Sequence, residues 1–120
     1  EFENVPAQAL ERLAAARPVT PAANVVAGCQ DRAAEKAHFV RCGVPCAPYA
    51  VISVADVLAS VTDELLPGVL KISQLGYDGK GQVKIFTRDE LAAAWDSLKR
   101  VPCVLERLMP LACEISVIVG

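Results

Sequence analysis

The feature that most constrains this fold is a glycine-rich segment between two short runs of β-forming residues. The runs are residues 69–73 and 83–86, and the segment between them holds Gly76, Gly79 and Gly81. Two such runs joined by a loop that contains glycine predict a β-hairpin. Helical patterns and further β-like runs lie on both sides of the hairpin. This interleaving of helices with strands predicts an α+β layer fold.

Prolines, glycines and capping residues divide the rest of the chain into short elements. The predicted helices cover residues 4–17, 20–26, 30–42, 53–61 and 87–100. Besides the hairpin, extended segments are predicted at residues 49–52, 102–106 and 114–119. Gly43 should end the helix that begins near residue 30. Ser53 with Asp56 and Thr87 with Glu90 resemble capping boxes.

Composition narrows the class of protein. The chain has 120 residues, of which 53% are hydrophobic, and this is enough to form one folded domain. Its net charge of -2 argues against the basic surface of a nucleic-acid-binding protein. No apolar run reaches the roughly 20 residues that a membrane span needs.

The cysteines predict neither disulfides nor a metal site. Their odd count of five, without C-x-x-C pairs, is a poor disulfide framework and indicates a reducing compartment, hence the cytoplasm. His38, Cys42 and Cys46 are spaced four residues apart, which on one helix would place them on one face. Gly43 and Pro45 interrupt that helix, so structural cysteines are favoured over metal ligands.

The glycine-rich segment has two interpretations from local chemistry alone. Its backbone can approach a ligand closely and aim N–H groups at an anion, with Lys80 adding a positive charge. It is not a P-loop, because no Ser or Thr follows Lys80 and a strand follows the loop where a helix should. Alternatively, Asp78-Gly79 simply makes the turn of a long hairpin. The two interpretations weigh about evenly.

Four other side chains are ambiguous in the same way. Lys71, in the first strand of the hairpin, is either an edge-strand lysine that blocks aggregation or a phosphate ligand beneath the loop. The neighbouring loop favours the second interpretation. Glu106 and Glu114 could accept hydrogen bonds from sugar hydroxyls or an amine, although solvated strand ends are favoured locally. Arg32, with Glu35 and Lys36 on the same helix, also suits simple surface ion pairs.

In chain order, six motifs form a recognisable series: Gln30-Asp31-Arg32, Glu35-Lys36, Leu70-Lys71, Gly76-Tyr77-Asp78-Gly79-Lys80-Gly81-Gln82, Leu105-Glu106 and Glu114-Ile115-Ser116-Val117-Ile118. The series resembles the ATP-grasp superfamily. Within it, the glycine-rich heptapeptide is similar to that of the 5-(carboxyamino)imidazole ribonucleotide synthase family, the PurK-type ATPase subunit of phosphoribosylaminoimidazole carboxylase. The resemblance implies a ligase that uses ATP and bicarbonate to carboxylate 5-aminoimidazole ribonucleotide in purine synthesis.

The resemblance also implies roles for individual residues. Arg32 and Lys71 would contact the phosphates of ATP, and residues 76–82 would form a lid over them. Residues 106–109 would be the hinge that reads adenine, mostly through backbone groups, and Glu114 would hold the ribose hydroxyls. The residues expected to bind the nucleotide are Arg32, Lys71, Gly76, Tyr77, Asp78, Gly79, Lys80, Gly81, Gln82, Glu106, Arg107, Leu108, Met109 and Glu114. Tyr77 and Asp78 would also face the aminoimidazole substrate.

The organisation of the chain follows from the same resemblance. Residues 1–20 would be the tail of an N-terminal domain, residues 21–104 the first ATP-grasp subdomain, and residues 105–120 the hinge and the start of the second subdomain. The Mg²⁺ ligands would lie beyond Gly120, so we expect a fragment with no catalytic or metal-binding residue and no activity of its own. The expected partners of the parent are small-molecule substrates, a second copy in a homodimer, and a separate or fused mutase, with no nucleic acid or membrane.

The sequence leaves two alternatives open. One is another ATP-grasp carboxylate–amine ligase, such as a formate-dependent purine enzyme or a biotin carboxylase, against which Tyr77-Asp78 argues. The other is a non-catalytic α+β binding or scaffold domain in which the glycine-rich segment is only a hairpin turn.

Overall fold

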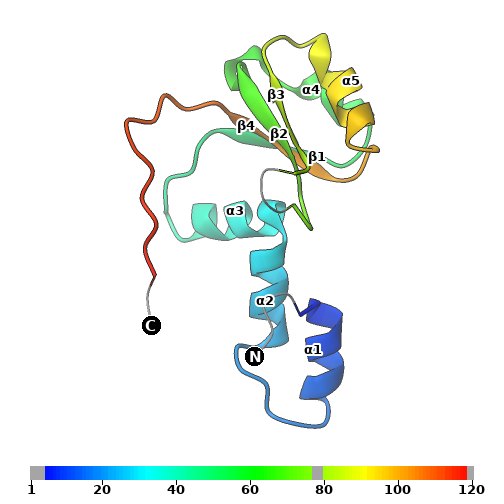
Figure 1. The fold of residues 1–120 in the computed structure, drawn as a ribbon, viewed down its shortest axis with the longest axis vertical. Coiled ribbons are helices and arrows are strands. Elements are labelled where there is room, and N and C mark those ends of the chain that lie inside the picture. Colours follow the sequence, from blue (N-terminus) through cyan, green and yellow to red (C-terminus); the bar gives the residue numbers. More distant parts are fainter. Residues whose placement is uncertain (1–4, 77–79, 119–120) are drawn as a thin grey trace.

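The chain folds as a four-stranded antiparallel sheet with short helices around it (Figure 1). The computed structural model describes residues 5–76 and 80–118. The helices are α1 (Ala7–Ala14), α2 (Ala23–Gln30), α3 (Arg32–Arg41), α4 (Asp56–Ser60) and α5 (Glu90–Ser97), with a 3₁₀ turn η1 (Asp63–Leu65). The strands are β1 (Tyr49–Ile52), β2 (Gly68–Ile72), β3 (Gln82–Ile85) and β4 (Cys103–Arg107). The predicted hairpin and the α+β class are confirmed.

The order of the strands is β1-β4-β2-β3, and every neighbouring pair is antiparallel. The strand β2 therefore lies inside the sheet, between β4 and β3. This position overturns the interpretation of Lys71 as an edge-strand lysine. In the register, Glu106 lies opposite both Tyr49 and Val69, and Val69 lies opposite Lys84. Directly opposed residues share a face of a sheet, so these side chains lie on one side.

The other side of the sheet, the apolar face, forms the core. Its fully buried side chains include Ile52, Leu70, Ile85, Cys103 and Leu105. Three residues of α5 close over them, and α4 and η1 add further apolar contacts. Each large aliphatic side chain buried in this way contributes about 1.5–3 kcal/mol. Burial also raises the pKa of the Cys103 thiol to about 11, so this cysteine stays protonated near neutral pH and is structural.

The helices α1 and α2 extend away from the sheet, with α1 packed on α2 and α2 packed on α3 (Figure 1). The prediction of a helical turn that ends by Val26 was too short, because α2 runs through Gly28 to Gln30. A Cβ at Gly28 would meet no atom within 4 Å, so nothing in the packing forces a break there. No helix in the described part of the chain is long and apolar enough to cross a membrane.

The ends of α3 follow from its sequence. Asp31 is the N-cap residue, and its carboxylate accepts hydrogen bonds from the backbone N–H groups of Ala33 and Ala34. Gly43 follows the last turn with φ = 71°, a left-handed conformation that favours glycine. The predicted stop at Gly43 is confirmed.

Both predicted capping boxes are wrong. The N-cap of α4 is Ala55, with no hydrogen bond from a side chain, so Ser53 does not cap this helix. The N-cap of α5 is Asp89, again without a side-chain bond. The carboxylate of Glu90 instead accepts a hydrogen bond from the backbone N–H of Phe86, at 2.8 Å. The helices α4 and α5 each begin two residues later than the capping patterns predict. Ser53 therefore lies too far from the first turn of α4 to cap it, and Thr87 lies too far from the first turn of α5.

The predicted last strand, residues 114–119, is also wrong for the residues that the structure describes. Residues 108–118 form no helix or strand, and Val119 lies outside the described residues. Ile115, Val117 and Ile118 are 82%, 77% and 95% exposed. An apolar β-like run becomes a strand only when another strand pairs with it. The strands described here are paired among themselves, and none of them pairs with this segment.

Candidate functional site

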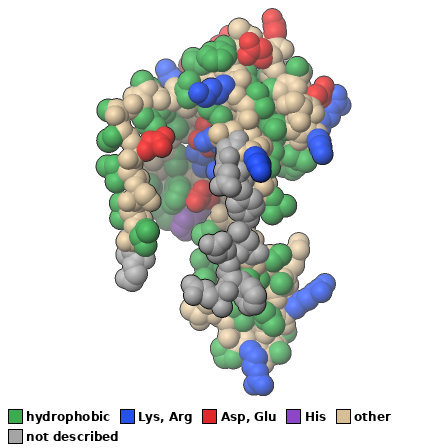
Figure 2. Space-filling view, in the orientation of Figure 1, with side chains coloured by type: hydrophobic (Ala, Val, Ile, Leu, Met, Phe, Trp, Pro, Cys, Tyr) green, Lys and Arg blue, Asp and Glu red, His purple; other side chains and the backbone are tan. Residues whose placement is uncertain are grey.

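The face of the sheet opposite the core carries the candidate site. We define the charged face as the side chains of Tyr49, Lys71, Lys84 and Glu106, which the register places on this side. Figure 2 shows acidic and basic side chains close together in the hollow between the sheet and the C-terminal segment. An antiparallel sheet commonly packs one face on a core and leaves the other face to polar groups and solvent, so the charged face is the side that a ligand can reach.

At the centre of the charged face, one carboxylate oxygen lies between two lysines. Glu106 Oε2 is 3.2 Å from Lys71 Nζ and 3.5 Å from Lys36 Nζ. The three side chains are only 15%, 26% and 13% exposed, respectively. Lys36 Nζ also lies 5.2 Å from the centroid of the Tyr49 ring, within reach of a cation–π interaction. Two lysines and one glutamate give the trio a formal net charge of about +1. The trio is also largely shielded from solvent, and both properties suit an anionic ligand.

The sequence identified two members of this trio and missed the third. Lys71 was expected to contact a phosphate, and in this structure its ammonium lies beside the carboxylate of Glu106. Lys36 was interpreted as part of surface ion pairs along its own helix, and that interpretation is wrong, because its carboxylate partner is on β4. The pairing depends on how α3 crosses the sheet, and helical spacing carries no signal for it.

Asp31 joins the start of α3 to the end of β2. Besides capping the helix, Asp31 Oδ1 accepts from Ser73 Oγ at 2.9 Å, and Oδ2 accepts from Gln74 Nε2 at 2.8 Å. The backbone N–H of Arg32 donates to the Ser73 carbonyl at 2.9 Å. Partial burial on its own would raise the pKa of Asp31, but these hydrogen bonds together hold it below the ordinary value of 3.8.

This junction places Arg32 at the root of the glycine-rich segment. A Cβ added to Gly76 would lie 3.7 Å from Arg32 Nη2, so the guanidinium reaches the first glycine of the loop. At the other end, Gly81 has φ = 74°, and a Cβ there would lie 2.5 Å from Ile72 Cδ1. Only glycine fits that position. The Ile72 N–H donates to the Gly81 carbonyl at 2.9 Å and closes the hairpin below the loop.

The remaining expected site residues are placed as follows. Tyr77, Asp78 and Gly79 lie outside the described residues, whereas Gly76 and Lys80–Gln82 flank them. Arg32, on α3, lies near Gly76 at one end of the loop, and Lys71, on β2, lies opposite Gln82 at the other end in the β2–β3 register. The structure therefore brings the expected phosphate contacts to one end of the charged face.

The expected adenine hinge, residues 106–109, begins inside β4, whose last two residues are Glu106 and Arg107. The N–H of Arg107 donates to the Pro48 carbonyl at 2.9 Å, and that of Leu108 donates to the Pro67 carbonyl at 2.8 Å. These two N–H groups are already hydrogen-bonded within the fold. Other backbone groups of residues 106–109 would therefore have to bind the adenine. Met109 is 42% exposed, and Glu114 is exposed in the irregular segment that follows.

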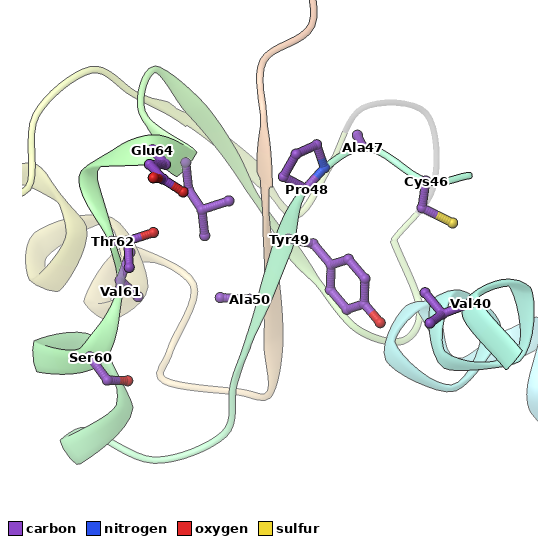
Figure 3. A pocket seen from close by; sticks show the side chains of 11 residues that line it. Val40, Cys46, Ala47, Pro48, Tyr49, Ala50, Ser60, Val61, Thr62 and Glu64 are labelled. Atoms are coloured by element: carbon purple, nitrogen blue, oxygen red, sulfur yellow. The ribbon is translucent and has the colours of Figure 1, made fainter. Parts of the chain in front are cut away.

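Two hollows flank these elements. One, of about 680 Å³, lies between α1, the start of α3 and the root of the loop, and Arg32, Glu35, Ser73 and Gly76 are among its lining residues. The other, of about 470 Å³, lies beside β1, with Tyr49 directed toward Val40 on one side (Figure 3). Among the described residues that line it, the second hollow has no lysine or arginine, so it is the poorer candidate for an anionic ligand.

No three His, Cys, Asp or Glu side chains within residues 5–76 and 80–118 lie close enough together to hold a metal ion. The described residues therefore supply no such ligand cluster for Mg²⁺, although the charged face suits the phosphates of a nucleotide.

Comparison with known proteins agrees with this geometry. The family model of the ATP-grasp domain matches residues 37–120. The chain therefore belongs to the ATP-grasp family, as its motifs predicted.

More particular similarities point to one group within that family. The chain is 40% identical over 119 residues to the N5-carboxyaminoimidazole ribonucleotide synthase of Pseudomonas aeruginosa, covering 98% of this chain and 33% of that protein. It also resembles the crystal structure of an N5-carboxyaminoimidazole ribonucleotide synthetase in complex with ADP, with a TM-score of 0.78 and 30% identity, covering 93% of this chain and 30% of the other. The Aspergillus clavatus synthase in complex with ATP gives a TM-score of 0.78 and 26% identity, covering 90% and 29%. The chain spans about a third of the length of the curated relatives it matches.

Proposed function

We propose that this chain is the ATP-binding part of a ligase that carboxylates 5-aminoimidazole ribonucleotide with bicarbonate in the synthesis of the purine nucleotide IMP, converting ATP to ADP and phosphate. The observation that carries the proposal is the 40% identity to an N5-carboxyaminoimidazole ribonucleotide synthase along 98% of the chain. The charged face supports it independently, because it gathers cationic groups beside a glycine-rich loop.

In this proposal the nucleotide lies over the charged face. Lys71 and Arg32 contact its phosphates, and residues 76–82 close over them as a lid. Residues 106–109 read adenine, and Glu114 holds the ribose hydroxyls. Tyr77 and Asp78 face the aminoimidazole substrate. What supports these roles is that Arg32 lies near Gly76 and that Lys71 lies opposite Gln82, at the two ends of the loop.

The chemistry that this site would assist consists mainly of positioning and charge neutralisation. An oxygen of bicarbonate attacks the γ-phosphorus, which gives carboxyphosphate and releases ADP. The amine of the ribonucleotide then takes the carboxyl group, either directly with loss of phosphate or through released CO₂. The ammonium of Lys71 and the guanidinium of Arg32 would offset the negative charge of the phosphates, and the lid would keep water away. Mg²⁺, with ligands that we propose to lie outside the described residues, would supply further neutralisation when bound.

The proposal extends to organisation and partners. Residues 1–20 would end an N-terminal domain, residues 21–104 would form the first ATP-grasp subdomain, and residues 105–120 would begin the second. The full-length protein would act in the cytoplasm as a homodimer and pass its product to a separate or fused mutase. The coverage of about a third of the synthases that this chain matches supports the view that other regions complete the active site.

The test is phosphate release by the full-length protein with ATP, Mg²⁺, bicarbonate and 5-aminoimidazole ribonucleotide. We expect release that requires both the ribonucleotide and bicarbonate, and no turnover by the 120-residue chain alone. ATP hydrolysis that does not respond to the ribonucleotide would contradict the proposed substrate. Turnover by the short chain at the parent's rate would mean that its metal ligands lie among residues we consider structural.

A further inference from the structure

We infer that Lys36 is a positioning residue of the nucleotide site. Lys36 holds the Glu106 carboxylate in place and neutralises its charge while Lys71 moves to a phosphate. The inference rests on the proposed function, because it assumes that Lys71 contacts a nucleotide. It adds a role for a residue that pairs with Glu106 and was not among the expected nucleotide contacts.

The two lysines of the trio share one carboxylate partner. The same oxygen, Glu106 Oε2, lies 3.2 Å from the Lys71 ammonium and 3.5 Å from the Lys36 ammonium. The two lysines come from different elements, β2 and α3, so their approach to one atom is set by tertiary packing. Lys36 is the less exposed of the two, at 13% against 26%. Lys71 is therefore the better placed to turn toward a ligand, while Lys36 stays behind.

Leaving the Glu106 carboxylate unpaired would cost free energy. Glu106 is only 15% exposed, so without Lys36 the loss of Lys71 to a phosphate would leave a poorly solvated carboxylate with no cation beside it. With Lys36 retained, the carboxylate keeps one partner in both states. Lys71 can then leave at a lower free-energy cost, and nucleotide binding is correspondingly tighter.

Neighbouring groups hold Lys36 in position. Its ammonium lies 5.2 Å from the Tyr49 ring centroid, and Tyr49 lies directly opposite Glu106 in the sheet. Five residues earlier, Asp31 fixes the start of α3 to Ser73 and Gln74, which directly follow β2. Lys36 therefore projects from a helix that is anchored to the strand carrying Lys71, which keeps its position fixed when a ligand arrives.

A double-mutant cycle on the full-length protein tests this role. ATP affinity in the presence of Mg²⁺ is measured by calorimetry for the wild type, Lys36→Met, Glu106→Gln and the double variant. We expect Lys36→Met to weaken binding about tenfold in the wild-type background. In the Glu106→Gln background the same change should alter affinity by less than about twofold, because no carboxylate remains to be held. Lys36→Arg, which keeps the charge, should bind like the wild type.

Lys99→Met is the matched control, since Lys99 is an exposed lysine after α5, away from the charged face. Equal losses in the two backgrounds would overturn the inference, because Lys36 would then act as a direct phosphate ligand or through the general fold. Unchanged affinity in Lys36→Met would overturn it as well. If Lys36→Met does not fold, Lys36→Gln replaces it in the same cycle. A wild-type protein that does not bind ATP would contradict the proposed function together with this inference, whereas wild-type binding without coupling would contradict the inference alone.

Discussion

The two faces of the sheet differ sharply although they are built from alternate residues of the same strands. On the apolar face, Leu70 and Leu105 are fully buried. Their immediate neighbours Lys71 and Glu106 point to the charged face, where they form a partly exposed ion pair. The alternation of side chains along a strand therefore places core and candidate site one residue apart. A rigid core on one face fixes the spacing of charges on the other.

The largest expected effect comes from breaking the apolar face. Leu70→Ala should lower the free energy of unfolding by about 2–5 kcal/mol, because it leaves a cavity in a closely packed core. Unfolding in urea measures this loss. Val51→Ala is the control, since Val51 is 40% exposed and should change stability by less than about 0.5 kcal/mol. Equal losses at the two positions would contradict the assignment of the faces.

The next effect separates binding from stability on the charged face. Lys71→Met should weaken ATP binding by about 1.5–3 kcal/mol, because it removes a charge-assisted contact with phosphate. We expect a much smaller change in the free energy of unfolding than in Leu70→Ala. Calorimetric titration of the full-length protein gives the affinity, with Lys99→Met as the charge-matched control. A folded Lys71→Met variant with wild-type affinity would return Lys71 to a structural role.

A smaller effect is expected at the junction that aligns the charged face with α3. Asp31→Ala should cost about 1 kcal/mol, the usual value of an N-cap, because it removes the cap of α3. It also removes the acceptor for Ser73 and Gln74. Urea unfolding near pH 7 measures the loss. A value near zero would mean that solvent replaces these hydrogen bonds without cost.

The same junction predicts a pH dependence. The pKa of Asp31 is lower in the folded chain than its ordinary value of 3.8. The ionised carboxylate therefore stabilises the fold fully above pH 3.8, and this contribution is lost as the pH falls from there through the folded pKa. The difference in stability between wild type and Asp31→Ala should shrink over that range. A difference that is constant with pH would contradict the stated cause.

The smallest effect is expected at Ser53. The start of α4 has no side-chain cap, and this helix is held through Val57 and Leu58, which pack against the core of the apolar face. Ser53→Ala should therefore change the free energy of unfolding by less than about 0.5 kcal/mol. A loss near the 1 kcal/mol of a typical cap would restore the capping box that the sequence predicted.

The comparison of the faces also shows what the sequence could predict. Local signals sufficed for the hairpin, for the stop at Gly43 and for the strand at residues 49–52, because each depends on the backbone preference of nearby residues. They failed at Ser53 and Thr87, where hydroxyl residues lie before the helices but not at their N-caps.

The errors with functional weight concern contacts between distant parts of the chain. Lys36 looked like a surface residue because its partner, Glu106, is 70 residues away in the sequence. Lys71 could be assigned to an edge or an interior strand only once the strand order was known. The segment at residues 114–118 has the composition of a strand, but composition cannot say whether a pairing strand is present. In each case the outcome depends on pairing between distant segments of the chain. A local sequence pattern carries no information about that pairing.

The most direct test of the central claim, that the charged face binds the nucleotide, is a crystal structure of the full-length protein with Mg²⁺ and a non-hydrolysable ATP analogue. We expect the nucleotide to lie over Tyr49, Lys71 and Glu106, with Lys71 Nζ about 2.7–2.9 Å from a phosphate oxygen. Glu106 should then keep Lys36 as its partner. A nucleotide bound elsewhere, or Lys71 still paired only with Glu106 and out of reach of any phosphate, would contradict the account.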